Sequence, residues 1–293
     1  MARDAQQGTG EARLAGGSFY GSVAQRKNLG GAIFTELRHD LARKLPTHSH
    51  EMPFFCLFFA GDYGEQYGRQ YMQFRPFTLS FRPAGVPHRD EIGPRGARMF
   101  GIEASKTWQA MVESASGNLS IAYDLRGGER LWLALKLYGE TCTTQQVDHL
   151  QVESLMAEML ALTGCPPDRT HDAPAWLGRV KDRVESEFRQ RLTLESLAAE
   201  AAIHPVHLSR SFRRFSGCGL GEYVRRLRVR QACELMLASE MSLVEISFAA
   251  GFADQSHFTR ACHAITGSSP GALRAMVSGG GATSVASLCP RPS

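Results

Sequence analysis

The residues best suited to chemistry lie on a predicted helix that carries arginine on one side and apolar side chains on the other. A helix turns by about 100° per residue, so Phe212 and Phe215 share one stripe with Leu208. Arg210 and Arg213 fall on the opposite side. An arginine in this position can donate two hydrogen bonds to a guanine edge in the major groove of DNA. One such helix is weak evidence, because an outward-facing arginine is usually only solvated.

The same pattern returns about fifty residues later, with Phe258 at the position of Leu208. Around Phe258, Cys262 is expected to be buried, whereas Arg260 and His263 point outwards. An internal repeat of this size sets the architecture of the region that contains it. We therefore predict two helix-turn-helix units, each ending in a helix with an outward-facing polar side.

Local signals predict where the helices of this region begin and how the two units are joined. His204 can cap the first polar helix, and Ser242 opens a capping box in the second unit. Gly251 suits a turn with positive φ, whereas the first unit has Ala202 at the matching place. A long helix over 220–238 is expected to hold the two units in a fixed relation.

The distribution of charge supports an anionic partner for this region. Residues 174–275 contain 14 Arg and Lys against 10 Asp and Glu, while the rest of the chain contains 19 of each. The excess positive charge therefore lies on the repeat-containing region, and 13 of its 14 basic residues are arginine. This distribution is typical of nucleic-acid binding.

Residues 176–274 resemble the DNA-binding domain of the AraC/XylS family of bacterial transcription regulators, which has two such units joined by a long helix. The chain departs from the family pattern at Cys262, Gly219 and Leu273, where Phe, Ser and Tyr are usual. These departures affect packing and leave the outward-facing residues in place. The segments that carry the resemblance are Leu208-Ser-Arg-Ser-Phe212 and Ile246-Ser-Phe-Ala-Ala-Gly251-Phe-Ala-Asp-Gln-Ser-His-Phe258-Thr-Arg260.

The resemblance implies a set of DNA-contacting residues on each polar helix. Because the first helix has three arginines and the second has one, we expect the first unit to supply more of the affinity. The implied residues are Val206, His207, Ser209, Arg210, Arg213 and Arg214 on the first helix, and Gln255, Ser256, His257, Thr259, Arg260 and His263 on the second.

The amino-terminal half has the signals of a β-rich domain followed by helices. Short aromatic and β-branched runs lie between residues 32 and 104, separated by Gly and Pro turn signals such as Gly61-Asp62 and 93–96. Such a block predicts a small β-barrel or sandwich. Two amphipathic helices are expected over 128–141 and 147–162, as a hairpin or across a subunit boundary. The polar and small-residue segments before residue 18 and after 275 are expected to be disordered, and residues 164–174 are expected to form a linker.

Three histidines are the candidate chemistry of this half. His48-Ser-His50 and Pro83-Ala-Gly85-Val-Pro-His88 resemble the two motifs of cupin barrels, where histidines and a nearby acid bind a divalent metal. The acid would be expected at Phe54 or Phe55, and neither can ligate a metal. Three histidines without a carboxylate can still hold zinc or iron. Because the acid is missing, we expect no metal and interpret the histidines as lining the barrel.

In AraC-type regulators the amino-terminal barrel is commonly a cupin-like effector pocket, so the resemblance assigns a binding role to this site. The expected effector-binding residues are His48, His50, Phe54, Phe58 and His88, with Phe55 and Tyr67 as further walls. The same resemblance suggests that the two helices after the barrel form the contact of a homodimer.

The sequence as a whole predicts a multi-domain α and β protein. A cupin-like β-barrel with a helical pair over 18–163 would bind an effector and dimerise, and an all-α domain over 174–275 would bind DNA. The predicted function is a transcription regulator controlled by a small molecule, with double-stranded DNA, an effector, a second copy and RNA polymerase as partners. We expect no catalytic residue, cofactor or membrane contact. The alternatives are a metal-dependent cupin enzyme fused to a DNA-binding domain, and a constitutive DNA-binding protein.

The location of the protein is predicted from two negative signals. The amino terminus lacks the apolar run of a signal peptide. The seven cysteines are scattered without a Cys-x-x-Cys pair, which indicates reduced thiols and no zinc framework. Both observations favour the cytoplasm.

Overall fold

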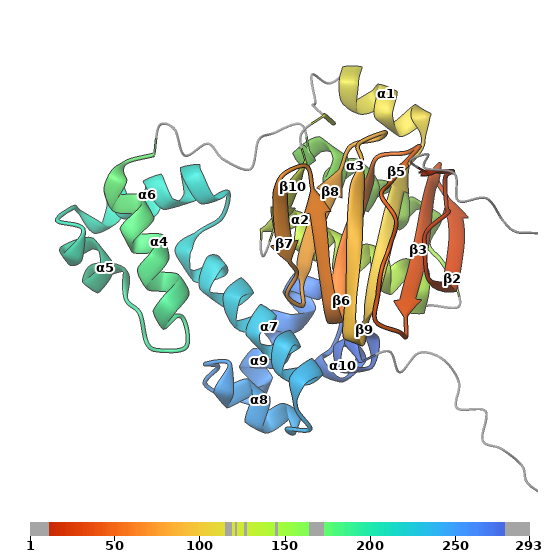
Figure 1. Ribbon diagram of the computed structural model, residues 1–293. Coiled ribbons are helices and arrows are strands. Elements are labelled where there is room, and N and C mark those ends of the chain that lie inside the picture. Colours follow the sequence, from red (N-terminus) through yellow and green to blue (C-terminus); the bar gives the residue numbers. More distant parts are fainter. Residues whose placement is uncertain are drawn as a thin grey trace, which may run out of the picture.

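The chain forms a β-rich amino-terminal part and a helical carboxy-terminal part, which confirms the predicted fold class (Figure 1). The computed structural model describes residues 12–114, 119–120, 122–125, 128–143, 146–163 and 173–278. The expected linker over 164–174 falls mainly on residues outside this described part. So do the expected disordered segments, apart from residues 12–17 and 276–278.

Within the described part of the chain, ten strands form one sheet that curls into a half-barrel. The central strand, β9, pairs with four others: β3, β4, β5 and β6. The strands are β1 (Ala12–Leu14), β2 (Ser22–Leu29), β3 (Ala32–His39), β4 (Arg43–Lys44), β5 (His48–His50), β6 (Phe54–Tyr67), β7 (Gln70–Gln73), β8 (Thr78–Arg82), β9 (His88–Ala104) and β10 (Tyr123–Leu125).

Two expected turns are absent from the described strands, because β6 runs through Gly61-Asp62 and β9 runs through 93–96. The glycines bend these strands instead of ending them. Gly61 has a φ of 105° and Gly96 a φ of 65°, values that favour a residue without a Cβ. A Cβ on Gly96 would lie 2.1 Å from the carbonyl oxygen of His39, so this glycine also permits a close crossing of the backbone.

The start of the sheet was missed in the sequence. β1 lies within the segment expected to be disordered, and it pairs in parallel with β5. β2 pairs with β3 along most of its length. Both strands have mixed polar sequences without clear alternation, so their order depends on pairing with the rest of the sheet and not on local propensity.

Side chains of β6 alternate between two faces of the sheet, as the two-residue period of a strand requires. Phe55, Leu57 and Phe59 belong to the core beneath the helices. Phe54 and Phe58 belong to a second apolar cluster inside the half-barrel. The expectation that Phe55 lines the effector pocket was therefore wrong, because its side chain points to the opposite face.

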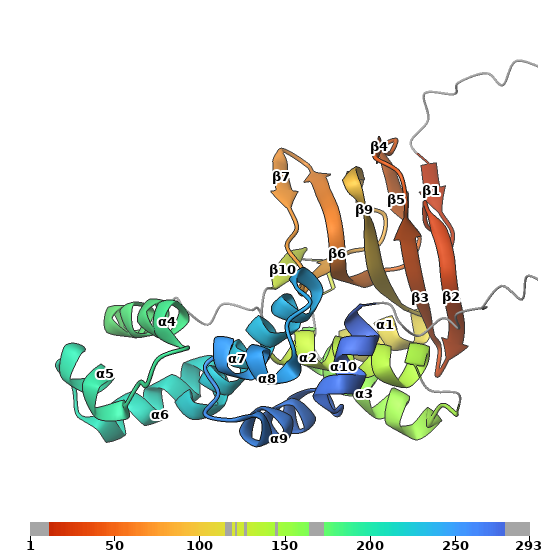
Figure 2. The ribbon, with the colours of Figure 1, turned by 90° about the horizontal axis from the view of Figure 1, so that it is seen from below.

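Among the described residues, three helices and a π-helical turn follow β9, with β10 between α1 and α2. Helices α2 and α3 pack together against one face of the sheet as a hairpin, one of the two expected arrangements (Figure 2). The extra helix α1 was not predicted. The bounds are α1 (Lys106–Ser114), α2 (Glu129–Tyr138), the π-helical turn (Gly139–Thr143) and α3 (His149–Thr163). None of the described helices is long and apolar enough to cross a bilayer.

Between residues 173 and 278 the structure has seven helices, with α7 as the predicted long connector. The first unit, α4 to α6, has a core of its own and stands away from the sheet. The second unit, α8 to α10, shares one continuous apolar core with α2, α3 and the sheet. The bounds are α4 (Ala175–Glu187), α5 (Leu194–Glu200), α6 (Pro205–Ser216), α7 (Leu220–Ala238), α8 (Leu243–Ala249), α9 (Gln255–Thr266) and α10 (Pro270–Val277).

The turns of the two units give a stability prediction. Gly251 has a φ of 89°, and an added Cβ would lie 2.6 Å from the Cα atom of Arg189. Gly251→Ala should therefore cost about 2 to 4 kcal/mol of unfolding free energy in urea denaturation. Ala202 takes a φ of 53° at the matching turn, and Ala202→Gly should be neutral or up to about 1 kcal/mol more stable. Equal stability of the two variants would contradict this account.

Candidate nucleic-acid interface and effector pocket

The first predicted recognition helix, α6, begins and ends where the sequence indicated. The Nδ1 atom of His204 accepts a hydrogen bond from the backbone N–H of Val206 at 3.3 Å. Gly217 ends the helix with a φ of 74°, the left-handed conformation typical of helix ends. Leu208 and Phe212 are fully buried in the core of the first unit. The opposite side of α6 is therefore left to face solvent.

The second recognition helix, α9, has the same geometry with a different cap. The carboxylate of Asp254 accepts from the backbone N–H of His257 at 2.6 Å. Gly267 ends the helix with a φ of 74°, as Gly217 does in the first unit. Phe258 and Cys262 are fully buried, so cysteine fills the core position where the family usually has phenylalanine.

The predicted DNA-contacting residues lie on the uncovered sides of the two helices. Among the twelve, only His257 is half-buried, and its ring lies 5.3 Å from that of Phe252. The exposed residues are Val206, His207, Ser209, Arg210, Arg213 and Arg214 on α6, and Gln255, Ser256, Thr259, Arg260 and His263 on α9.

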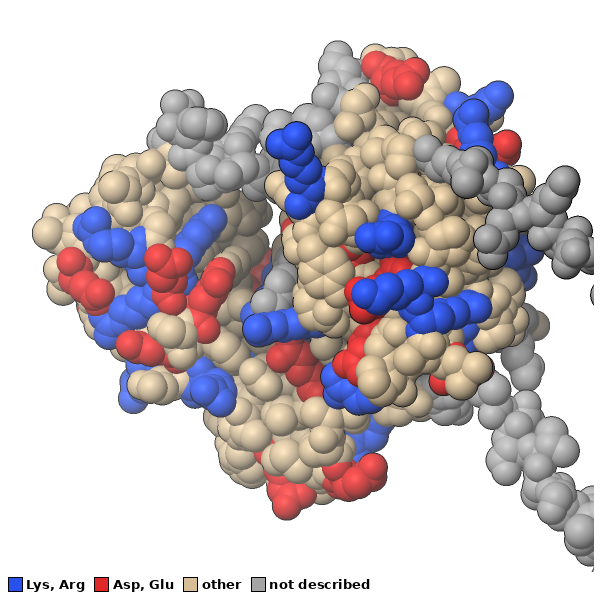
Figure 3. Space-filling model, in the orientation of Figure 1, with Lys and Arg blue, Asp and Glu red and all other residues tan. Residues whose placement is uncertain are grey.

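A groove of about 870 Å³ lies between the two units and contains arginines that were not among the predicted DNA-binding residues. Ser209 of α6 and His257 of α9 line this groove, so it adjoins both recognition helices. Its arginines are Arg189, Arg191, Arg225 and Arg228. Basic and acidic side chains are interspersed on the face shown in Figure 3. In the sequence, these arginines could have been noticed as positive charges in the segments next to the recognition helices.

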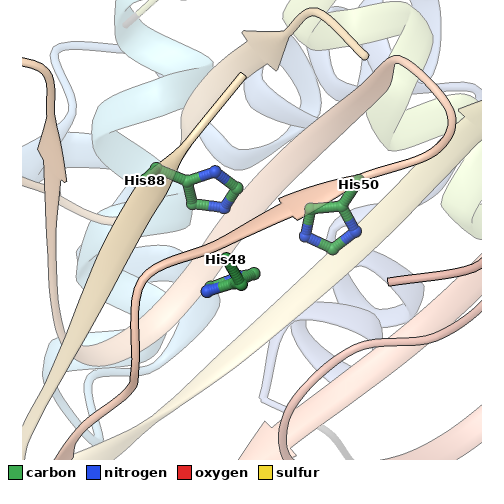
Figure 4. A group of neighbouring side chains, drawn as sticks. All are labelled: His48, His50 and His88. Atoms are coloured by element: carbon green, nitrogen blue, oxygen red, sulfur yellow. The ribbon is translucent and has the colours of Figure 1, made fainter. Parts of the chain in front are cut away.

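The three predicted histidines come together inside the half-barrel. His48 and His50 lie on β5, and His88 begins the neighbouring β9, where it pairs directly with His48. Nitrogen atoms of the three rings lie within 4.8 Å of one another, and all three side chains are buried (Figure 4). Phe54 packs against His50, with ring centroids 4.5 Å apart. Phe58 is fully buried deeper in the same cluster, against Tyr63 and Phe74.

Burial makes the charged form of two of these histidines unfavourable. The pKa of His48 is lowered to about 4, first by burial and then by the neighbouring His88. The pKa of His50 is lowered to about 3 by burial and by the other two imidazoles. Both rings are therefore neutral near pH 7, and each has a nitrogen with a free lone pair.

Acidic residues that the sequence did not single out line the same interior. Asp90 lies two residues after His88, and the pairing of β6 with β9 places Glu65 opposite it. Glu65 forms two 2.7 Å hydrogen bonds with Arg82. The alternation of His88 and Asp90 along one strand is the signal that could have shown that both face inwards. Glu65 could be found only from the strand register.

Two aromatic residues before β2 cover the histidines. The ring of Phe19 lies 4.8 Å from that of His50, and the ring of Tyr20 lies 4.9 Å from that of His48. A Cβ on Gly101 would lie 3.2 Å from Phe19, so this glycine leaves room for the phenylalanine ring. The segment between β1 and β2 thus covers the histidine cluster, although no local sequence pattern predicted its position.

Comparison with known proteins matches the helical part of the chain first. Residues 197–276 match the family described as "Helix-turn-helix domain". The chain is 33% identical over 90 residues to the probable transcription factor PqrA of Proteus vulgaris, covering 31% of this chain and 70% of that protein. The chain belongs to the AraC/XylS family of bacterial transcription regulators.

Other members of the helix-turn-helix class match different lengths of this AraC/XylS-family chain. The uncharacterized regulator YfiF of Bacillus subtilis is 28% identical over 186 residues, 59% of each chain. The DNA-binding domain of AdpA, solved with a target DNA, is 28% identical, with a TM-score of 0.33 over 34% of this chain and 89% of that chain. The chain spans from 31% to 59% of the length of the first curated relatives it matches.

A half-buried arginine connects the sheet of this AraC/XylS-family chain to its second helix-turn-helix unit. Arg98 of β9 donates to the backbone carbonyls of Met276, at 2.9 Å, and Val277, at the end of α10. Glu36 of β3 and the hydroxyl of Tyr138 of α2 hold the same guanidinium at 2.9 and 2.6 Å. Because cations favour the carboxyl end of a helix, this contact stabilises the docked position of α10.

Glu103 gives the interior a pH dependence. Burial raises the pKa of the Glu103 carboxyl to about 7, although the backbone N–H of Gly17 donates to it at 2.7 Å. The folded chain therefore binds this proton more tightly than the unfolded chain, so Glu103 contributes up to about 3 kcal/mol of stability near pH 4.5 that is lost by pH 7. This contribution is opposite in sign to that of His48 and His50, whose lowered pKa values make the folded state more stable as pH rises. Glu103→Gln keeps an acceptor for Gly17 and removes this contribution, so stability should rise more steeply with pH than in the wild type in melting curves measured from pH 5 to 8. Glu113→Gln, an exposed control on α1, should leave the slope as in the wild type.

Proposed function

We propose that the chain is a sequence-specific DNA-binding transcription regulator that reads the major groove with α6 and α9. The observation that carries this proposal is the pair of capped helices whose apolar sides are buried and whose predicted contact residues are on the uncovered sides. The arginines of the groove between the units would contact phosphates and set the orientation of the protein on DNA. Family membership supports the same conclusion.

The two units are unequal in this proposal. α6 carries Arg210, Arg213 and Arg214 and belongs to a unit that stands away from the sheet. α9 carries Arg260 alone and belongs to the unit docked on α2. We therefore assign more of the affinity to α6, and to α9 a contact that depends on how the second unit is docked.

The recognition helices are tested by single substitutions. Arg210→Ala and Arg260→Ala should each cost roughly 1 to 3 kcal/mol of discrimination at one base position, because each removes a base-edge contact. The measurement is gel-shift competition on sites selected from random DNA. Arg69→Ala, an exposed arginine in the β6–β7 hairpin, is the matched control and should bind as the wild type. Unchanged binding by both helix variants would contradict the assignment of α6 and α9 as recognition helices.

The effector site in this proposal is the interior of the half-barrel. His48, His50 and His88 supply polar ring atoms there, while Phe54 and Phe58 supply apolar surface. A ligand in contact with the histidines must also meet Phe19 and Tyr20, which lie against them. This arrangement of a few polar groups in an apolar surround is typical of small-molecule sites.

The route from this pocket to DNA is proposed to run along β9. The strand carries His88 at one end and Arg98, which holds the end of α10, farther along. A change in the pocket that shifts β9 would alter the hold on α10 and so the position of α9. Allosteric coupling requires an element with two positions whose equilibrium is changed by both the ligand and the DNA, and β9 with α10 would be that element.

The coupling is tested at the arginine. Arg98→Ala removes the hydrogen bonds to α10 and one of the cationic partners of Glu36, which keeps its contacts with Arg38 and the hydroxyl of Tyr138. The second unit should therefore be held less firmly. Footprinting should show altered protection of the half-site read by α9, with protection by α6 retained. Arg95→Ala, on the same strand but paired only with Asp62 among the described residues, is the control. A wild-type footprint from Arg98→Ala would rule out this route.

Further partners follow from the regulatory role. We propose a homodimer that uses α3, because α2 is covered by the second unit and Leu150 at the start of α3 is 74% exposed. RNA polymerase is proposed as the partner on the promoter, and the cytoplasm as the location, since the DNA lies there. The proposal includes no catalytic role. A DNA affinity insensitive to every small molecule tested would favour the constitutive alternative.

A further inference from the structure

Four side chains with metal-binding atoms meet inside the half-barrel. His48, His50 and His88 contribute ring nitrogens within 4.8 Å of one another. Figure 4 shows the three rings gathered in the space between their two strands. The carboxylate of Asp90 adjoins them, with its Oδ2 atom 3.7 Å from the Nε2 atom of His48. This carboxylate comes from β9, not from the start of β6 where the sequence comparison expected an acid.

Backbone hydrogen bonds set the orientation of two of the rings. The Nδ1 atom of His48 lies 3.0 Å from the carbonyl oxygen of Pro46, and that of His88 lies 3.2 Å from the carbonyl oxygen of Val86. A carbonyl accepts only, so Nδ1 carries the proton in each ring and Nε2 holds the lone pair. Such carbonyl contacts are the usual support of metal-ligating histidines.

The third ring has a buried nitrogen without a partner. His50 is 2% exposed, and its Nδ1 atom has no hydrogen bond among the described residues. Leaving a buried polar atom unsatisfied is unfavourable. Because no ring nitrogen of His50 is hydrogen-bonded to the described residues, the nitrogen that faces His48 and His88 is available to a ligand.

The charges around the cluster also favour a cation. Arg82 is the basic side chain hydrogen-bonded in this interior, and it already binds both oxygens of Glu65 and one of Asp124. Asp90 receives a hydrogen bond from Tyr63 at 3.0 Å on Oδ1, which leaves Oδ2 directed at the histidines. One arginine thus faces three carboxylates, and a divalent ion beside Asp90 would balance them.

We propose that His48, His50, His88 and Asp90 bind a divalent first-row transition-metal ion, with zinc or ferrous iron as the fitting class. Three imidazoles and one carboxylate suit these ions, whereas magnesium and calcium prefer ligand sets made of oxygen. Glu65 lies near His88 and Asp90 but is engaged by Arg82, so it supports the site from outside. Binding draws the ring nitrogens together to the separations of a tetrahedral site.

The inference rests on the proposed role of the half-barrel as the effector pocket, and it names the class of ligand. The metal site would lie directly beneath Phe19 and Tyr20, so metal binding and the position of the segment before β2 would be linked. It would also lie on the strand that carries Arg98. The ion itself is therefore the proposed effector.

The test is direct metal binding by the full chain after treatment with a chelator. Titration calorimetry and elemental analysis should give one equivalent of Zn²⁺ and no binding of Mg²⁺. His88→Gln should weaken Zn²⁺ binding by at least about 100-fold, and Asp90→Asn by about 10- to 100-fold. His39→Gln, a buried histidine of β3 outside the cluster, and Asp62→Asn, a carboxylate of β6 outside it, should bind as the wild type.

A second readout needs no variant, so misfolding of a variant does not decide the outcome. Co²⁺ added to the wild-type protein should give the visible absorption of a tetrahedral site with nitrogen and oxygen ligands. Absence of this band, or Zn²⁺ binding equal in the wild type and the folded cluster variants, would overturn the inference. If the protein binds DNA but no metal, the proposed function stands and the metal site is wrong. If it binds metal but not DNA, the metal site stands and the proposed function is wrong.

Discussion

The pairing of β9 with β6 is the interaction on which both parts of the molecule depend. It sets Glu65 opposite Asp90 and Tyr67 opposite His88, and farther along it sets Phe58 opposite Met99. The two long strands bend at glycines. One face of these strands lines the half-barrel, and the other face packs against α2 and α3. A slip of one residue would exchange the two faces of either strand. The same strand register therefore specifies both the polar interior of the half-barrel and the apolar surface on which α2 packs.

The sheet also makes the two helix-turn-helix units different, because only the second unit packs against it through a shared core. The first unit is complete without the sheet, because its three helices and the first half of α7 bury a core that contains no strand residue. The second unit buries Phe258 and Cys262 in a core continuous with α2 and the sheet. Two units similar in sequence thus differ in what holds them. The two units are therefore expected to respond differently to the proposed ligand of the half-barrel.

The barrel interior combines groups that are unfavourable when buried separately. Neutral histidines, an arginine and three carboxylates lie beside Phe54 and Phe58. Such a network is stable only when its members satisfy one another, and partial satisfaction is costly. In this network the Nδ1 atom of His50 has no hydrogen-bond partner among the described residues, so the network is only partly satisfied. A ligand that completes the network would gain affinity from the same buried groups that are unfavourable without it.

The sequence by itself determined what depends on near neighbours along the chain. The repeat, the caps at His204 and Ser242, the connector helix and the buried sides of α6 and α9 could all be predicted, because helix periodicity and capping act over a few residues. Tertiary structure alone decided the rest. Strand register brought Asp90 and Glu65 to the histidines, and pairing with β5 ordered β1. The docking of the second unit on α2 depends on surfaces more than a hundred residues apart, whose fit no local pattern encodes.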